Sequence, residues 1–192
     1  LFTVRPPAAI KGMTNFLLKI AYRVLRRMRK IAMETLTIAF GKEKSREELE
    51  QICKQCFFNA GRCAIEIGVY NTRPQLLLSK LRFDGDSQAN LEAALKDGKG
   101  VLGISAHFGN FPLMLLYLAQ RGYPTNAIIR PSRDEKIEVH FQEARMRLGL
   151  KTIHSYPRET CVRQSIKALR SKELLVVLLD QNTGSKSGVF VN

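Results

Sequence analysis

The sequence is short of acidic residues, cysteines and long apolar runs, and it contains no tryptophan. Asp and Glu number 17 against 31 Lys and Arg in 192 residues, so the formal charge is +14 at pH 7. Such a balance favours a polyanionic partner: nucleic acid, an anionic membrane surface or a phosphorylated ligand. No stretch approaches the ~18 consecutive apolar residues of a membrane-spanning helix.

The four cysteines predict neither a metal site nor a redox pair. Cys53 and Cys56 form a C-x-x-C, but a zinc site needs a second pair of ligands and none follows Cys161. A thioredoxin-like pair would follow a strand, whereas this one lies in a stretch that has the pattern of a helix. We therefore expect these residues and Cys63 to be reduced helix cysteines, and we expect no metal and no cofactor.

Residues 11–40 have the pattern of a basic amphipathic helix. Apolar residues recur at the spacing of one helix face, and Lys and Arg fill much of the remainder. One interpretation is a helix lying in an anionic membrane interface, and the other is a helix that packs on the domain with a solvated basic face. Both can hold for one helix. A second helix is expected from Ser45, where Ser45 and Glu48 form a capping box.

From residue 100 onward, strands and helices alternate. Apolar runs predict strands over 100–105, 125–130, 150–154 and 173–180, with helices between them. A further short strand is expected at 82–83. This order predicts an α/β fold with a mostly parallel sheet flanked by helices, preceded by N-terminal amphipathic helices. We divide the chain into a helical membrane-interface region, 1–80, and an α/β core, 81–192, that is incomplete at its C-terminal end.

Polar side chains collect where the predicted strands end, which is where ligands bind in such sheets. His107 follows the first strand, and a histidine there can accept a proton near neutral pH. Asn110 is a plausible N-cap for the next helix, whose free N–H groups can hold a phosphate or an oxyanion. The other residues at strand ends are Ser105, Arg130, His154, Asp180 and Gln181.

Three motifs between Val101 and Asn192 resemble those of one known family. His107-Phe-Gly-Asn-Phe-Pro112 is similar to an H-x-G-N-W-E pattern, and Arg130-Pro-Ser-Arg-Asp134 is similar to an R-P-x-x-N segment. Asp180-Gln181 and the later GSKSGVFVN complete the series in the same order. The chain therefore resembles the bacterial late lipid A acyltransferases, lauroyl/myristoyl type, of the lysophospholipid acyltransferase superfamily.

The resemblance implies a glycerol-3-phosphate acyltransferase-like fold on the cytoplasmic face of the bacterial inner membrane, peripheral or anchored. It implies transfer of a fatty acyl chain from acyl carrier protein or CoA to a hydroxyl of a phosphorylated lipid acceptor, a lipid A precursor or a lysolipid. His107 would be the general base. Arg130 and Arg133 would bind lipid phosphate through their guanidinium groups. The remaining substrate-binding residues implied are Asn110, Gln181, Lys186 and Gly188.

One position departs from the family pattern. Pro112 stands where the family has an acid that orients the histidine. Asp180 is a tentative replacement because it ends a neighbouring predicted strand. The alternatives are that His107 acts unaided, or that the chain is a catalytically altered or inactive lipid-binding relative.

Two other functions compete with acyl transfer. Gly103 to His107 is similar to a nucleophile elbow, so Ser105 could be the nucleophile of a serine hydrolase with His154 as its base. The histidine in place of the last small residue argues against this alternative. Nucleic-acid binding would need a binding module or basic residues interleaved with stacking aromatics, and the sequence shows neither. We expect no nucleic-acid partner.

Overall fold

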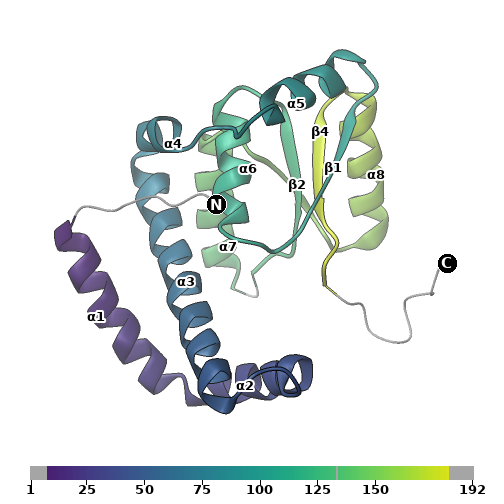
Figure 1. The fold of residues 1–192 in the computed structure, drawn as a ribbon. Coiled ribbons are helices and arrows are strands. Elements are labelled where there is room, and N and C mark those ends of the chain that lie inside the picture. Colours follow the sequence, from purple (N-terminus) through teal and green to yellow (C-terminus); the bar gives the residue numbers. More distant parts are fainter. Residues whose placement is uncertain (1–7, 133, 182–192) are drawn as a thin grey trace. The chain divides into compact units, whose positions relative to one another are not determined.

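A computed structural model of the chain describes residues 8–132 and 134–181, with the side chains of residues 8–11 and 13 left out (Figure 1). The chain divides into two compact units, Leu1–Val69 and Tyr70–Asn192. The regions expected from the sequence divide later, after residue 80, and the roles given to them stay predictions. The described residues contain eight helices and four strands.

The first unit contains α1 (Ala8–Val24), α2 (Arg26–Phe40) and nearly all of α3 (Arg46–Thr72). The amphipathic stretch 11–40 thus forms two helices, which separate at Leu25 (φ −78°, ψ 52°). α1 packs closely on α3 at Gly61, where an added Cβ would lie 2.1 Å from a methyl carbon of Leu18. No residue of α2 is buried. The first unit therefore covers α2 only in part.

The start of α3 confirms the predicted capping box. The Ser45 backbone N–H donates to Glu48 Oε2 at 2.8 Å, and the Glu48 N–H donates to Ser45 Oγ at 3.3 Å. Each bond satisfies an N–H group that has no partner within the helix. A local sequence signal thus fixes where the longest helix begins.

The second unit is an α/β fold with a four-stranded parallel sheet, which confirms the predicted fold class. The strands lie in the order β1-β4-β2-β3. The short strand expected at 82–83 does not form, because this segment is an irregular connection between two helices. The elements of this unit are α4 (Pro74–Lys80), α5 (Ser87–Lys96), β1 (Val101–Ser105), α6 (Phe111–Gln120), β2 (Thr125–Ile129), α7 (Glu135–Arg147), β3 (Lys151–His154), α8 (Arg158–Arg170) and β4 (Leu174–Leu178).

Helices cover both faces of the sheet, with α8 on one side and α6 and α7 on the other (Figure 1). On the α8 face, Leu175 packs with Ile153 and Ala168 in a buried cluster. Leu174 and Val176 alternate with Leu175 and are also buried, as expected for a strand covered on both faces. The sheet is thus buried around β4, which is the second strand in the order of the sheet. The predicted site residue Asp180 lies just beyond the end of β4.

The edge strand β1 is less well covered. Leu102 and Ile104 are 54% and 68% exposed. Val162 and Ile166 of α8 are also exposed and lie along a hollow of about 810 Å³ on the outer side of that helix. This hollow is lined neither by His107 nor by Asp180, so it is separate from the residues described next.

The four cysteines form no disulfide, which agrees with the prediction that they are reduced. Cys53 is buried, Cys56 is exposed, and Cys63 and Cys161 are half-buried. Across residues 8–132 and 134–181, no helix combines the length and the apolar character needed to cross a bilayer.

Candidate active site

The strand order brings the two most important predicted residues together. His107 lies two residues beyond β1 and Asp180 two residues beyond β4, and these strands are hydrogen-bonded neighbours. Their parallel register pairs Ser105 with Leu178. The Leu179 N–H continues the ladder by donating to the Ser105 carbonyl at 3.1 Å. Both residues therefore extend from the same end of one rigid ladder.

The Asp180 carboxylate holds His107 at two points. Its Oδ1 atom lies 2.9 Å from Nδ1 of the imidazole, and its Oδ2 atom accepts the backbone N–H of His107 at 3.0 Å. The bond to a carboxylate fixes the neutral imidazole as the tautomer with hydrogen on Nδ1. Nε2 then carries the lone pair. This is the arrangement in which an acid orients a histidine to act as a base.

The electrostatics of the pair agree with this assignment. The hydrogen bond from the His107 side chain lowers the pKa of Asp180, and burial opposes it only in part. Asp180 therefore stays ionised at neutral pH, where it would stabilise an imidazolium. The side chains of His107 and Asp180 are 34% and 37% exposed. The ring is thus held in place and is still open to a ligand.

The chain turns sharply after His107 to enter α6. Gly109 adopts φ +60°, which L-residues with side chains rarely take. Asn110 occupies the predicted N-cap position, but its side chain makes no capping hydrogen bond. The ring of Phe111 packs edge-on against the imidazole, with centroids 4.8 Å apart. Pro112 follows in the first turn of the helix, where its missing N–H costs no helical hydrogen bond.

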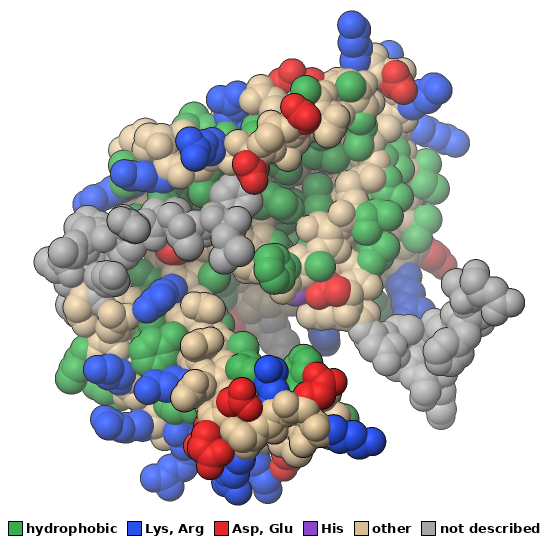
Figure 2. Space-filling view, in the orientation of Figure 1, with side chains coloured by type: hydrophobic (Ala, Val, Ile, Leu, Met, Phe, Trp, Pro, Cys, Tyr) green, Lys and Arg blue, Asp and Glu red, His purple; other side chains and the backbone are tan. Residues whose placement is uncertain are grey.

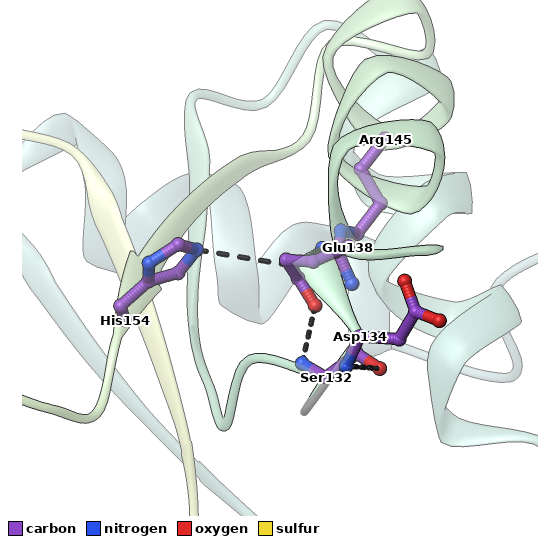
Figure 3. A network of polar contacts seen from close by, with 5 residues as sticks. All are labelled: Ser132, Asp134, Glu138, Arg145 and His154. Atoms are coloured by element: carbon purple, nitrogen blue, oxygen red, sulfur yellow. Dashed lines mark hydrogen bonds and ion pairs between the residues drawn. The ribbon is translucent and has the colours of Figure 1, made fainter. Parts of the chain in front are cut away.

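A second cluster holds the loop that follows β2 (Figure 3). The Ser132 backbone N–H donates to Glu138 Oε2 at 2.6 Å, and Arg145 donates to Glu138 Oε1 at 2.6 Å. Nε2 of His154 lies 3.7 Å from the same Oε1 atom. Asp134 accepts the N–H groups of residues 136 and 137 and so caps α7. The two carboxylates therefore hold the loop after β2 at Ser132 and at its junction with α7.

Glu138 is a residue that the sequence analysis missed. Its side chain is buried, although it lies in a helix of mixed charge that gives no sign of a buried acid. Burial alone would raise its pKa, but the hydrogen bond from Ser132 and the charge of Arg145 together lower it. Glu138 is therefore ionised and anchors the loop after β2 at Ser132. Its only sequence signal is the position four residues after the capping aspartate.

The other predicted site residues fall into two groups. Arg130 follows β2, the strand next to β4, and it is exposed, as is Gln181. Arg130 therefore follows a strand two positions from β1, roughly 10 Å away in the sheet. Arg133, Lys186 and Gly188 lie outside the described residues.

The sheet order argues against the serine hydrolase. Ser105 ends β1 and His154 ends β3, and these strands lie at opposite edges of the four-stranded sheet. Three strand spacings separate them by roughly 14 Å, well beyond hydrogen-bond reach. His154 instead faces Glu138. The base proposed for Ser105 is therefore not available to it.

An oriented histidine at the end of a parallel strand, with an arginine two strands away, is able to take a proton from a hydroxyl of a phosphorylated ligand. No curated protein matches the chain at a meaningful level. The sequence profile of one protein family, described as bacterial lipid A biosynthesis acyltransferase, matches residues 1–192. The family implies transfer of an acyl group from a donor to a lipid acceptor. The chain belongs to the bacterial lipid A biosynthesis acyltransferase family.

Proposed function

We propose that this chain is an active acyltransferase in which His107 is the general base and Asp180 orients it. The observation that carries the proposal is the double contact of one carboxylate with the ring and the backbone of His107, at 2.9 and 3.0 Å. In this arrangement Asp180 supplies from β4 the acid that Pro112 cannot supply from α6.

The reaction needs one base and no covalent enzyme intermediate. Nε2 of His107 takes the proton of the acceptor hydroxyl while the oxygen attacks the thioester carbonyl. The C–S bond of the tetrahedral intermediate then breaks. The thiolate leaves and takes the proton back from the imidazolium, so the products are an ester and a thiol. Asp180 stabilises the imidazolium between these two steps.

The substrates follow from the charges near the site. Arg130 is exposed after β2 and its guanidinium suits the phosphate of a lipid A precursor or lysolipid. Gln181, next to Asp180, and Asn110, at the start of α6, are the polar residues that would contact the acceptor's hydroxyls. The donor is a thioester of acyl carrier protein or of CoA.

We also propose that the chain works on the cytoplasmic face of the bacterial inner membrane. The support is the first unit, whose helices expose apolar side chains beside many Lys and Arg (Figure 2). A helix with this composition binds an anionic interface through burial of its apolar face and attraction of its cations.

The test is acyl transfer from acyl carrier protein and CoA thioesters to a panel of lysolipids and lipid A precursors in detergent micelles. His107→Ala should lower kcat by about 10³-fold, the usual contribution of a general base. The matched control is His140→Ala, which removes an exposed histidine of α7. Equal loss in both variants, or none in either, would contradict the assignment.

The Pro112→Glu variant distinguishes an active acyltransferase from an inactive lipid-binding relative. If Asp180 orients His107, adding the acid at position 112 should change kcat little. If the wild-type chain transfers no acyl group and Pro112→Glu does, the chain is an inactive lipid-binding relative. Fluorophosphonate labelling that disappears in Ser105→Ala would instead restore the hydrolase hypothesis.

A further inference from the structure

A hollow of about 340 Å³ opens among the three helices of the first unit. Four of its six lining side chains are positive, two are aromatic and none is acidic. Every lining residue lies within residues 1–69, whereas the candidate active site lies in the second unit. The lining residues are Lys19, Tyr22 and Arg23 of α1, Arg29 of α2, and Lys54 and Phe58 of α3.

The positive charge of this pocket is not neutralised by the described part of the chain. No ion pair among the described residues includes Lys19, Arg23 or Lys54. Glu50 of α3, whose charge acts on Tyr22, forms an ion pair with Arg46 at 3.2 Å. Like charges gathered in one concave place repel each other, and a bound anion relieves that repulsion.

The aromatic side of the pocket is fixed by packing. Tyr22 meets Phe57 edge-on, with ring centroids 5.5 Å apart, and its hydroxyl is hydrogen-bonded to Cys53. Burial raises the pKa of Tyr22, so the phenol stays neutral. The Arg29 guanidinium lies 4.7 Å from the centre of this ring. One of the four cations is therefore held in place by a cation–π contact before any ligand binds.

An exposed apolar stripe lies on α1, the helix that contributes Lys19 and Arg23 to the pocket. Phe16, Ile20 and Val24 are four residues apart on α1 and are 63%, 42% and 71% exposed. They share one face of the helix, and Lys19 and Arg23 lie beside that face. A small soluble anion would use only the cations, whereas a lipid would cover the stripe as well.

We propose that this pocket binds the phosphate of a phosphomonoester lipid at a membrane surface. A phosphomonoester carries about −1.5 to −2 charges at pH 7, which suits four cations better than the single charge of a phosphodiester. The apolar stripe enters the acyl region beside it. The proposal rests on the proposed membrane attachment and is independent of the chemistry at His107.

The test compares binding of the full chain to vesicles of phosphatidylcholine that contain either phosphatidate or phosphatidylglycerol, matched in surface charge. Wild type should prefer phosphatidate roughly tenfold. Arg23→Ala/Lys54→Ala should bind both vesicles equally. The matched control, Arg26→Ala/Arg27→Ala, removes two charges outside the pocket, so it should bind both vesicles more weakly and keep the preference.

Four outcomes would contradict the proposed role of the pocket. Two concern wild type: equal binding to the two vesicles, or binding to neither. The other two are a phosphatidate preference that survives in Arg23→Ala/Lys54→Ala and a preference that is lost in the control. Release from phosphatidate vesicles by inorganic phosphate would assign the site to soluble phosphate instead. Acyl transfer in micelles is measured on the same preparations. An inactive protein that keeps the preference contradicts the proposed function alone, and an active protein without it contradicts the pocket alone.

Discussion

Strand β4 of the second unit and helix α2 of the first unit differ in how far they bury their apolar side chains. In the second unit, Leu174, Leu175 and Val176 of β4 are all buried beneath helices. In the first unit, α2 buries none of its residues, and Met28, Ile31 and Ile38 are 56%, 53% and 88% exposed. Both units are rich in apolar residues. The difference is that β4 lies in the buried centre of a sheet, whereas α2 presents apolar side chains next to its cations.

The proposed function gives different tasks to the two units. A sheet with a dense core holds side chains at its strand ends within the small tolerance that proton transfer requires. An exposed basic amphipathic surface tolerates variation in detail because its binding depends on summed area and charge. The first arrangement suits chemistry and the second suits attachment.

The largest effect should come from separating the carboxylate from the histidine. Asp180→Asn should lower kcat about 10³-fold with little change in KM, because the amide no longer stabilises the imidazolium. Since the pKa of Asp180 is below its ordinary value, the carboxylate of the wild-type chain is ionised throughout the neutral range, so its own titration should not limit the wild-type rate there. Asp180→Glu should recover part of the rate, which a merely structural role would not require.

The control for Asp180 is the same chemical change in the first unit. Glu43→Gln removes an exposed carboxylate after α2 and should leave kcat unchanged. Equal losses in the two variants would break the comparison, because chemistry would then depend on the first unit as well. Steady-state kinetics in micelles measures both.

The next effect concerns stability. Leu175→Ala removes a side chain that is 2% exposed in the α8-side core, and should lower the free energy of unfolding by about 3 kcal/mol. Ile38→Ala on α2 should change it by less than about 0.5 kcal/mol, because that side chain is already 88% exposed. Urea unfolding of both variants in solution checks this difference. A cost at Ile38 near that at Leu175 would mean that α2 has a packed partner.

The smallest expected effect comes from removing the charge of Glu138, which anchors the loop after β2. Glu138→Gln should cost about 2 kcal/mol, because Arg145 and the Ser132 N–H lose a buried charge. It should also raise KM for the phosphorylated acceptor more than it lowers kcat, since the loop carries Arg130. The control is Glu143→Gln, an exposed acid on the same helix. A loss in kcat alone would contradict the positioning role.

Glu138 also predicts a pH dependence of stability. Its pKa is lowered in the folded chain, so its contribution is complete above the pKa of the unfolded state, about 4.3. The contribution is lost as pH falls through the lower, folded value. Glu138→Gln should therefore flatten the fall in unfolding free energy below about pH 4.3. An unchanged slope would mean that other carboxylates account for it.

Much of the second unit could be predicted from the sequence, because a buried parallel strand needs a continuous apolar run such as Leu174 to Leu178. The strand order could not, since nothing local says that β1 lies beside β4. The contact between His107 and Asp180 depends on that order and was predicted only as one of several outcomes. Glu138 was missed because its burial depends on a contact with the loop after β2, at Ser132, which the charge pattern of α7 does not indicate.

The first unit was harder to predict for a different reason. Every residue from Val24 to Met28 is compatible with a helix, and no Pro or Gly marks the break at Leu25. The break is therefore set by packing between helices. The capping box at Ser45 was predicted correctly because both of its hydrogen bonds lie within four consecutive residues.

The register of β1 against β4 has a consequence for how a chain with the proposed activity can evolve. His107 and Asp180 each lie two residues past the paired positions Ser105 and Leu178. A slip of one residue would shift β1 against β4 by about 3.3 Å. It would also turn the side chains of one strand to the opposite face of the sheet. Substitutions that loosen this ladder would therefore misalign His107, the proposed general base, without touching it. Selection for turnover should accordingly constrain apolar residues of two strands that never contact a substrate.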